Sequence, residues 1–101
     1  MAVNQLKIVV SILREISDGN PFPKATDYGI DNNVYNDILE AMQDDNLVKN
    51  IRFQHDSTKK VVAAFPSDAT ITIRGMEYLN ENSALAKTYK GLKEVREWLP
   101  F

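Results

Sequence analysis

The order of the elements predicted by the residues after Asp31 limits the possible folds of this chain more than any other feature. Apolar side chains recur there at helical spacing, which predicts a helix over 31–45. Residues 47–54 and 61–65 then form two short apolar segments around a polar turn, the pattern of a two-stranded antiparallel hairpin. Thr72 predicts the capped start of another helix, because its hydroxyl can accept from a first-turn amide. A helix, a hairpin and a helix in this order are typical of the second half of a winged helix-turn-helix domain, with the hairpin as its wing.

The flanking segments extend this pattern with helices. Apolar residues between 5 and 16 cover about 200° of a helix, which is wider than one core face needs. That helix is therefore either central to the domain or shared with a partner. Residues 24–28 leave room for about one helical turn, and 84–99 predict one continuous last helix. We expect one domain over 1–101, α+β and mainly helical, folded as a winged helix-turn-helix with a two-stranded wing and an additional C-terminal helix.

Composition excludes several classes of protein. The chain has 101 residues, which fits one domain, and its lack of cysteine excludes disulfides, thiolate metal sites and cysteine nucleophiles. No apolar run approaches the roughly 20 residues that a membrane span needs. The first residues lack the basic start and the cleavage site of a signal peptide, so we expect a cytoplasmic protein without membrane contact. The glycines stand apart and form no phosphate-binding loop, and no small-molecule substrate is evident.

The segment from Ile71 to Trp98 carries a resemblance to a known family. It contains the helix start Thr72-x-x-Gly75-x-x-Tyr78 and a terminal segment, 87–98, that is rich in lysine and holds the tryptophan. With a wing and about 100 residues in all, the chain resembles the YjcQ family of small winged-helix proteins from Gram-positive bacteria and their prophages. The resemblance implies the winged-helix fold and a phage-linked origin, and it implies no catalytic residues.

Candidate catalytic groups lack the partners that catalysis needs. His55 is the only histidine and falls in the predicted wing turn, and Asp56 beside it should point away. The consecutive carboxylates of Asp44 and Asp45 diverge by about 100° on a helix and so do not share a metal site. We therefore expect a protein that is not an enzyme and that holds no metal or cofactor.

One hypothesis is that the chain contacts duplex DNA. In a winged helix, 31–45 would be the recognition helix that enters the major groove, and Asn33 and Asn36 could read adenine edges. That helix carries five acids and no cation, so it should repel phosphates. The wing is better suited to phosphate contact, through four cations. They are Lys49, Arg52, Lys59 and Lys60.

The other hypothesis is a protein-interaction adaptor. The acidic helix 31–45 would present Asp37, Glu40 and Asp44 to a basic partner, and the first and last helices would add apolar surface. On a continuous last helix, Ala84, Gly91 and Trp98 lie seven residues apart along one edge, where two small residues beside a tryptophan would admit another helix. A weak homodimer is the self-association that this surface predicts. The sequence leaves the DNA and protein hypotheses both open, and we rank the DNA-associated role first.

Overall fold

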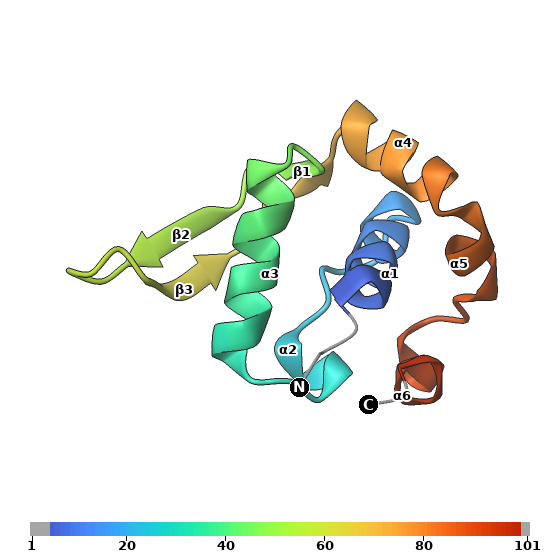
Figure 1. Ribbon diagram of the computed structural model, residues 1–101, viewed down its shortest axis with the longest axis horizontal. Coiled ribbons are helices and arrows are strands. Elements are labelled where there is room, and N and C mark those ends of the chain that lie inside the picture. The colour runs from blue at the N-terminus through green and yellow to red at the C-terminus, as the bar shows by residue number, and fades with distance from the viewer. Residues whose placement is uncertain (1–4, 100–101) are drawn as a thin grey trace.

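The computed structural model describes residues 5–99 and shows a helical body from which a β-hairpin projects (Figure 1). The helices are α1 (Gln5–Ser17), α2 (Ala25–Tyr28), α3 (Asn32–Asp44), α4 (Ile73–Glu81), α5 (Ser83–Thr88) and α6 (Val95–Trp98), with a 3-10 turn η1 (Leu92–Glu94). The strands are β1 (Val48–Lys49), β2 (Arg52–His55), β3 (Val61–Phe65) and β4 (Thr70–Ile71). The predicted α+β, mainly helical class is confirmed.

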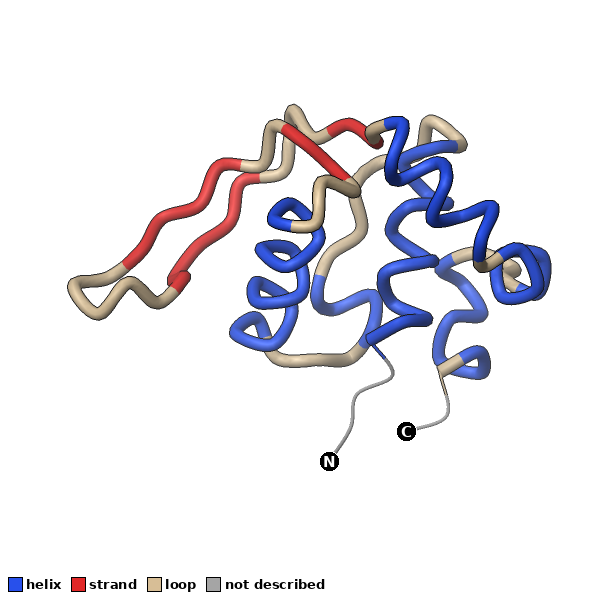
Figure 2. The backbone as a smooth tube through the Cα atoms, turned by 45° about the horizontal axis from the view of Figure 1, so that its top comes forward, coloured by secondary structure: helices blue, strands red, loops and turns tan. Residues whose placement is uncertain are grey.

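The strands form two separate antiparallel pairs. β2 pairs with β3 as the hairpin, with a register irregularity between Gln54 and His55, while β1 pairs with the two residues of β4 at its base. The prediction of one strand over 47–54 was wrong, because Asn50 adopts a left-handed φ of 70° that separates β1 from β2. Asparagine tolerates that conformation better than most residues. The bend lets the hairpin extend well beyond the helices (Figure 2).

Helix α1 lies at the centre of the body, as the wide apolar arc allowed. Ile8, Val10, Ile12 and Leu13 are fully buried, and α3, α4 and α5 all contact this helix. Leu6 is 42% exposed and remains at its edge. The central interpretation of α1 is therefore confirmed for most of its arc.

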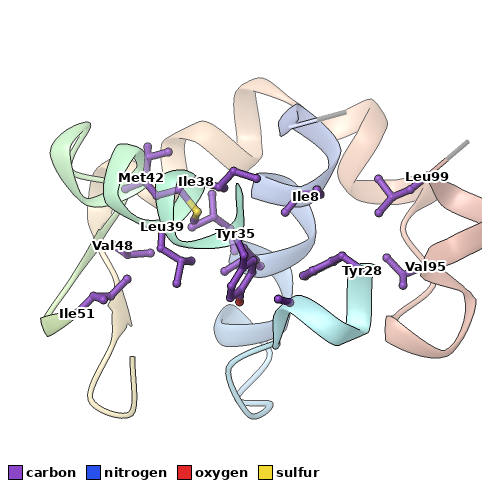
Figure 3. Close-up of a cluster of buried hydrophobic side chains, with 14 of the residues drawn as sticks. Ile8, Tyr28, Tyr35, Ile38, Leu39, Met42, Val48, Ile51, Val95 and Leu99 are labelled. Atoms are coloured by element: carbon purple, nitrogen blue, oxygen red, sulfur yellow. The ribbon is translucent and has the colours of Figure 1, made fainter. Parts of the chain in front are cut away.

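The core continues from α1 through α2 and α3 (Figure 3). Tyr28 and Tyr35 pack with ring centroids 6.1 Å apart, and both are buried. The Tyr28 hydroxyl lies 2.8 Å from the Ser11 hydroxyl, and the Tyr35 hydroxyl donates to the carbonyl of Pro23. Burial raises the pKa of each phenol above its ordinary value, because the low-dielectric interior disfavours the phenolate.

The two predicted helix caps have different outcomes. The Thr72 hydroxyl accepts from the amide of Gly75 at 2.9 Å and caps α4, as predicted. Asp31 occupies the N-cap position of α3, but its side chain makes no capping hydrogen bond, so that part of the prediction was wrong. The amides of the first turn of α3 are left without a side-chain cap from this residue.

The last helix is not continuous, which corrects the prediction for 84–99. Helix α5 ends at Thr88, and Gly91 takes a φ of 105°, so the chain turns before η1 and α6. A residue in that conformation cannot continue a right-handed helix. The seven-residue spacing of Ala84, Gly91 and Trp98 therefore does not produce a shared helix edge.

Candidate functional site

The four candidate wing cations are spread along the hairpin and its base. Lys49 belongs to β1, Arg52 to β2, and Lys59 and Lys60 to the turn before β3. All four are exposed, and none makes an ion pair with another residue of 5–99. Their side chains are therefore open to solvent and to an anionic partner, and Asp56 in the same turn interacts electrostatically with Lys60.

Asp56 organises the hairpin turn that carries the two lysines. Its carboxylate accepts from the Thr58 amide at 2.8 Å, from the Thr58 hydroxyl at 2.6 Å and from the Lys60 amide at 3.0 Å. These hydrogen bonds, led by that of the Thr58 hydroxyl, lower the pKa of Asp56. Lys59 has a left-handed φ of 67° within this turn. The lysine backbones thus have a defined conformation while their ammonium groups project into solvent.

The solvent-facing stripe of α3 is acidic. Asn33, Asp37, Ala41 and Asp44 recur along it at helical spacing and are exposed. Asn36 does not belong to this stripe: it is only 8% exposed, so the expectation that it would face solvent beside Asn33 was wrong. The stripe presents carboxylates and no cation.

Glu40 connects α3 to the hairpin. Its carboxylate lies 2.9 Å from Nε2 of His55 at the end of β2, and both side chains are more than a third exposed. Sequence reasoning correctly placed His55 in an exposed position but missed this partner, which lies 15 residues away on another element. The pair links one edge of α3 to the hairpin. Because both side chains are exposed, this contact contributes little to the free energy of unfolding.

A groove of about 550 Å³ opens between α2, the first half of α3 and the end of β3. Its lining residues are Phe22, Pro23, Lys24, Ala25, Thr26, Asn32, Tyr35, Asn36, Leu39, Ala64, Pro66 and Ser67. Sequence reasoning did not identify this site, because the end of β3 is distant in the chain from α2 and α3, which supply the other walls. The prolines at 23 and 66 were the available signal, since Pro23 disfavours a regular strand before α2 and Pro66 directly follows the last residue of β3.

A second, smaller groove of about 270 Å³ runs between α1, α3 and α4. Leu6, Val9, Ala41 and Tyr78 contribute apolar surface there, and Asp45 lies at its edge. This groove is where the remaining exposed part of the α1 arc meets the acidic helix.

Gly91 and Trp98, which were predicted to form a contact surface on one last helix, lie on different elements and have different structural roles. Trp98 packs its ring against Tyr89, with centroids 4.9 Å apart, and donates from Nε1 to the Thr88 hydroxyl at 3.2 Å. Lys7 donates to the backbone carbonyl of Trp98 at 3.0 Å. Trp98 thus fastens α6 to the end of α5 and to α1, while Gly91 supplies the turn between η1 and α5.

Comparison with known proteins assigns the chain to a family. The family model described as YjcQ protein matches residues 8–98, from within α1 to the end of α6. The chain belongs to the YjcQ family. A relative from Bacillus subtilis (strain 168), named Uncharacterized protein YjcQ, is 25% identical over 97 residues, or 96% of this chain and 99% of the relative. No solved structure matches the chain.

No helix between residues 5 and 99 is long and apolar enough to cross a membrane. Over the same range, no three or more histidine, aspartate or glutamate side chains are grouped so that they could hold a metal ion.

Proposed function

We propose that this YjcQ-family chain is a winged helix-turn-helix module that associates with duplex DNA through its hairpin, as a non-catalytic accessory or regulatory factor. In this proposal α2 and α3 form the helix-turn-helix, and β2 and β3 form the wing. The observation that carries it is the set of four exposed cations without ion pairs on the hairpin and its base. Cations on a projecting hairpin can reach phosphates while the helical body stays outside the groove.

The acidic stripe of α3 determines what kind of DNA binding is proposed. Asp37 and Asp44 are exposed there, and inserting them into a groove would bring carboxylates close to phosphates. Asn36 lines the groove between α2, α3 and β3 and is not on the solvent-facing stripe, which leaves Asn33 as the amide on that stripe. The proposed complex therefore depends on phosphate contacts, with little sequence preference and strong sensitivity to salt.

A gel-shift titration of mixed-sequence duplex DNA at low salt tests this function. We expect a complex that weakens as salt is added and that weakens further when Lys59 and Lys60 are replaced by alanine. Asn33→Ala is the control on α3, and the proposal expects it to bind like the wild type. A sequence-specific complex that is lost with Asn33→Ala and kept without the two lysines would contradict the proposed mode.

The second candidate function is a protein-interaction adaptor, favoured by the same acidic stripe. Asp37, Glu40 and Asp44 would attract a basic segment, and the groove containing Leu6 and Tyr78 would receive its apolar side chains. Electrostatic attraction of this kind accelerates association, while the apolar groove would supply most of the affinity. A weak homodimer through the exposed part of α1 belongs to this candidate.

Sedimentation at increasing protein concentration distinguishes self-association from a monomer, and Leu6→Glu is the matched variant. If α1 forms the contact, the variant should shift the equilibrium toward monomer, because a carboxylate cannot be buried cheaply in an apolar interface. A species that is monomeric at every concentration would remove the homodimer and leave only a heterologous partner for this surface.

A further inference from the structure

The groove between α2, α3 and β3 has the volume of a binding site and is lined by the side-chain amide of Asn36. At about 550 Å³ it falls within the ordinary range for ligand pockets of roughly 300–1,000 Å³. Its walls are mainly apolar, from Phe22, Leu39, Ala64 and Pro66. None of the four hairpin cations lines it, so this site is separate from the proposed DNA contact.

Asn36 is the buried polar group that lines this groove. It is 8% exposed, and its side chain makes no hydrogen bond to any residue of the described chain. Every completely inaccessible side-chain nitrogen or oxygen in residues 5–99 does have a partner, so the amide of Asn36 keeps its remaining access through the groove. Buried amides are normally paired, because leaving one unpaired costs free energy. Asn36 thus offers an NH2 donor group and a carbonyl acceptor, side by side, to whatever enters the groove.

The β3 wall of the groove offers further unpaired backbone groups. Strand β3 has β2 on one side, and in the described structure no backbone hydrogen bond outside that pair involves residues 61–65 (Figure 1). Pro23, which also lines the groove, has no amide hydrogen to donate to β3. Strand β3 also contacts α3, and Ala64 is its residue that lines the groove. At that end of β3 the unpaired edge is a template for one more extended chain.

We propose that this groove binds an extended, acidic peptide segment of a partner protein, which adds to the free edge of β3 while Asn36 pairs with one of its peptide units. A peptide unit presents an N–H and a C=O that match the two functions of the Asn36 amide, and only an extended chain also presents such groups along a strand edge. Alternate side chains of the peptide would pack between Phe22 and Leu39.

The positive charge of Lys24 is the reason for proposing an acidic peptide. Lys24 is the charged side chain in the groove lining, it is exposed, and it makes no ion pair with any described residue. The carboxylate of Asp27 on the adjacent turn is directed to the Lys24 backbone amide, 2.7 Å away. The ammonium group of Lys24 is therefore positioned to pair with a carboxylate of the bound segment.

The binding test uses two blocked peptides, acetyl-Val-Ala-Val-Glu-amide and acetyl-Val-Ala-Val-Lys-amide. Each is added at millimolar concentration to the nitrogen-15-labelled chain of 101 residues. We expect the glutamate peptide to shift the NMR signals of the Asn36 side-chain amide and of the backbone amides of β3. The lysine peptide should bind at least about tenfold more weakly. Absence of any shift in these signals with the glutamate peptide would overturn the proposal.

Two pairs of variants separate this binding mode from a nonspecific contact. Asn36→Leu should weaken the glutamate peptide at least about tenfold, while Asn33→Leu on the exposed stripe should stay within about twofold. Lys24→Glu should reverse the preference between the two peptides, and Lys49→Glu, outside the groove, should preserve it. Unchanged binding in Asn36→Leu or an unchanged preference in Lys24→Glu would overturn the proposal.

A thermal measurement without ligand provides an independent check of the role of Asn36. If its amide has no partner in the free protein, Asn36→Leu should raise the melting temperature, because an unpaired buried amide is replaced by an apolar group. Asn33→Leu should leave the melting temperature nearly unchanged. A lower melting temperature for Asn36→Leu would show that the amide stabilises the fold itself, and it would overturn its assignment as a ligand-binding group.

Discussion

The backbone of Gly75 in α4 lies directly against the carbonyl oxygen of Leu47, so that a Cβ on Gly75 would stand 2.2 Å from that oxygen. The Thr72 amide donates to the same carbonyl at 3.2 Å. This close approach joins the start of α4 to the segment that follows α3. It also explains why a glycine is found in the first turn of a helix, where it lowers helix propensity.

Gly75→Ala should therefore destabilise the protein by about 3 kcal/mol, the upper part of the usual range for overpacking. The new methyl group would meet backbone atoms, which cannot move aside as a flexible side chain could. Asn80→Ala, at an exposed position of the same helix, is the control and should change stability by less than about 0.5 kcal/mol. Urea unfolding of both variants measures the difference, and a tolerated Gly75→Ala would contradict the close contact.

Removing the cap of the same helix should have a smaller effect. Thr72→Ala loses the hydrogen bond from the Gly75 amide and the one that the hydroxyl donates to the Asn46 carbonyl, and it should cost about 1 kcal/mol. Thr72→Ser retains the hydroxyl and should recover most of that loss. If serine and alanine were equally destabilising, the methyl group of Thr72 and not its cap would be the stabilising feature.

Stability at high pH should report on the buried phenols of Tyr28 and Tyr35. Burial raises both pKa values in the folded state, while the unfolded chain keeps its ordinary value near 10.0. Below about pH 10 both phenols are protonated in either state, so they should not make the free energy of unfolding depend on pH. Above it, the unfolded state loses protons that the folded state retains, so stability should fall by about 1.4 kcal/mol per pH unit for each tyrosine.

Urea unfolding between pH 8 and pH 11, with phenolate absorbance recorded in parallel, measures this dependence. Tyr35→Phe removes one titrating group and should make the decline shallower. Ionisation of all tyrosines near pH 10 in the folded protein, without loss of stability, would contradict the burial of these phenols.

The left-handed backbone of Lys59 should make the hairpin turn less stable than it could be. Lys59→Gly removes a Cβ from a φ of 67° and should stabilise the protein by about 0.5–1 kcal/mol. Lys60 does not have positive φ, so Lys60→Gly is the matched control and should be neutral or destabilising. Thermal unfolding of the two variants is the measurement, and equal effects would show that the turn conformation of Lys59 carries no strain.

Local sequence signals predicted most of the elements. The apolar stripe after Asp31 correctly predicted α3, and the polar stretch between the two apolar segments correctly predicted the hairpin. Thr72 correctly predicted the start of α4, because a cap depends on residues only three positions apart. Such features are governed by short-range chemistry that can be recognised in the sequence.

The errors arose where tertiary contacts or single backbone angles decide the structure. The 3-4 apolar spacing over 84–99 continues through Gly91, but one left-handed residue changes the direction of the chain. Asn36 lies on a face of α3 that borders the groove formed with α2 and β3, so its burial could not be read from helical spacing. The contact of Glu40 with His55 and the groove beside β3 likewise depend on how distant segments pack.

The salt dependence of DNA affinity is the most direct test of the proposed function. Measured with one mixed-sequence duplex, log K against log salt concentration should be a falling line, whose slope reflects the number of phosphates contacted. Replacing Lys59 and Lys60 with alanine should reduce that slope by about two phosphate contacts, because each lost cation no longer displaces a counterion. An unchanged slope in the double variant, or no measurable binding by the wild-type chain at low salt, would contradict DNA association through the hairpin.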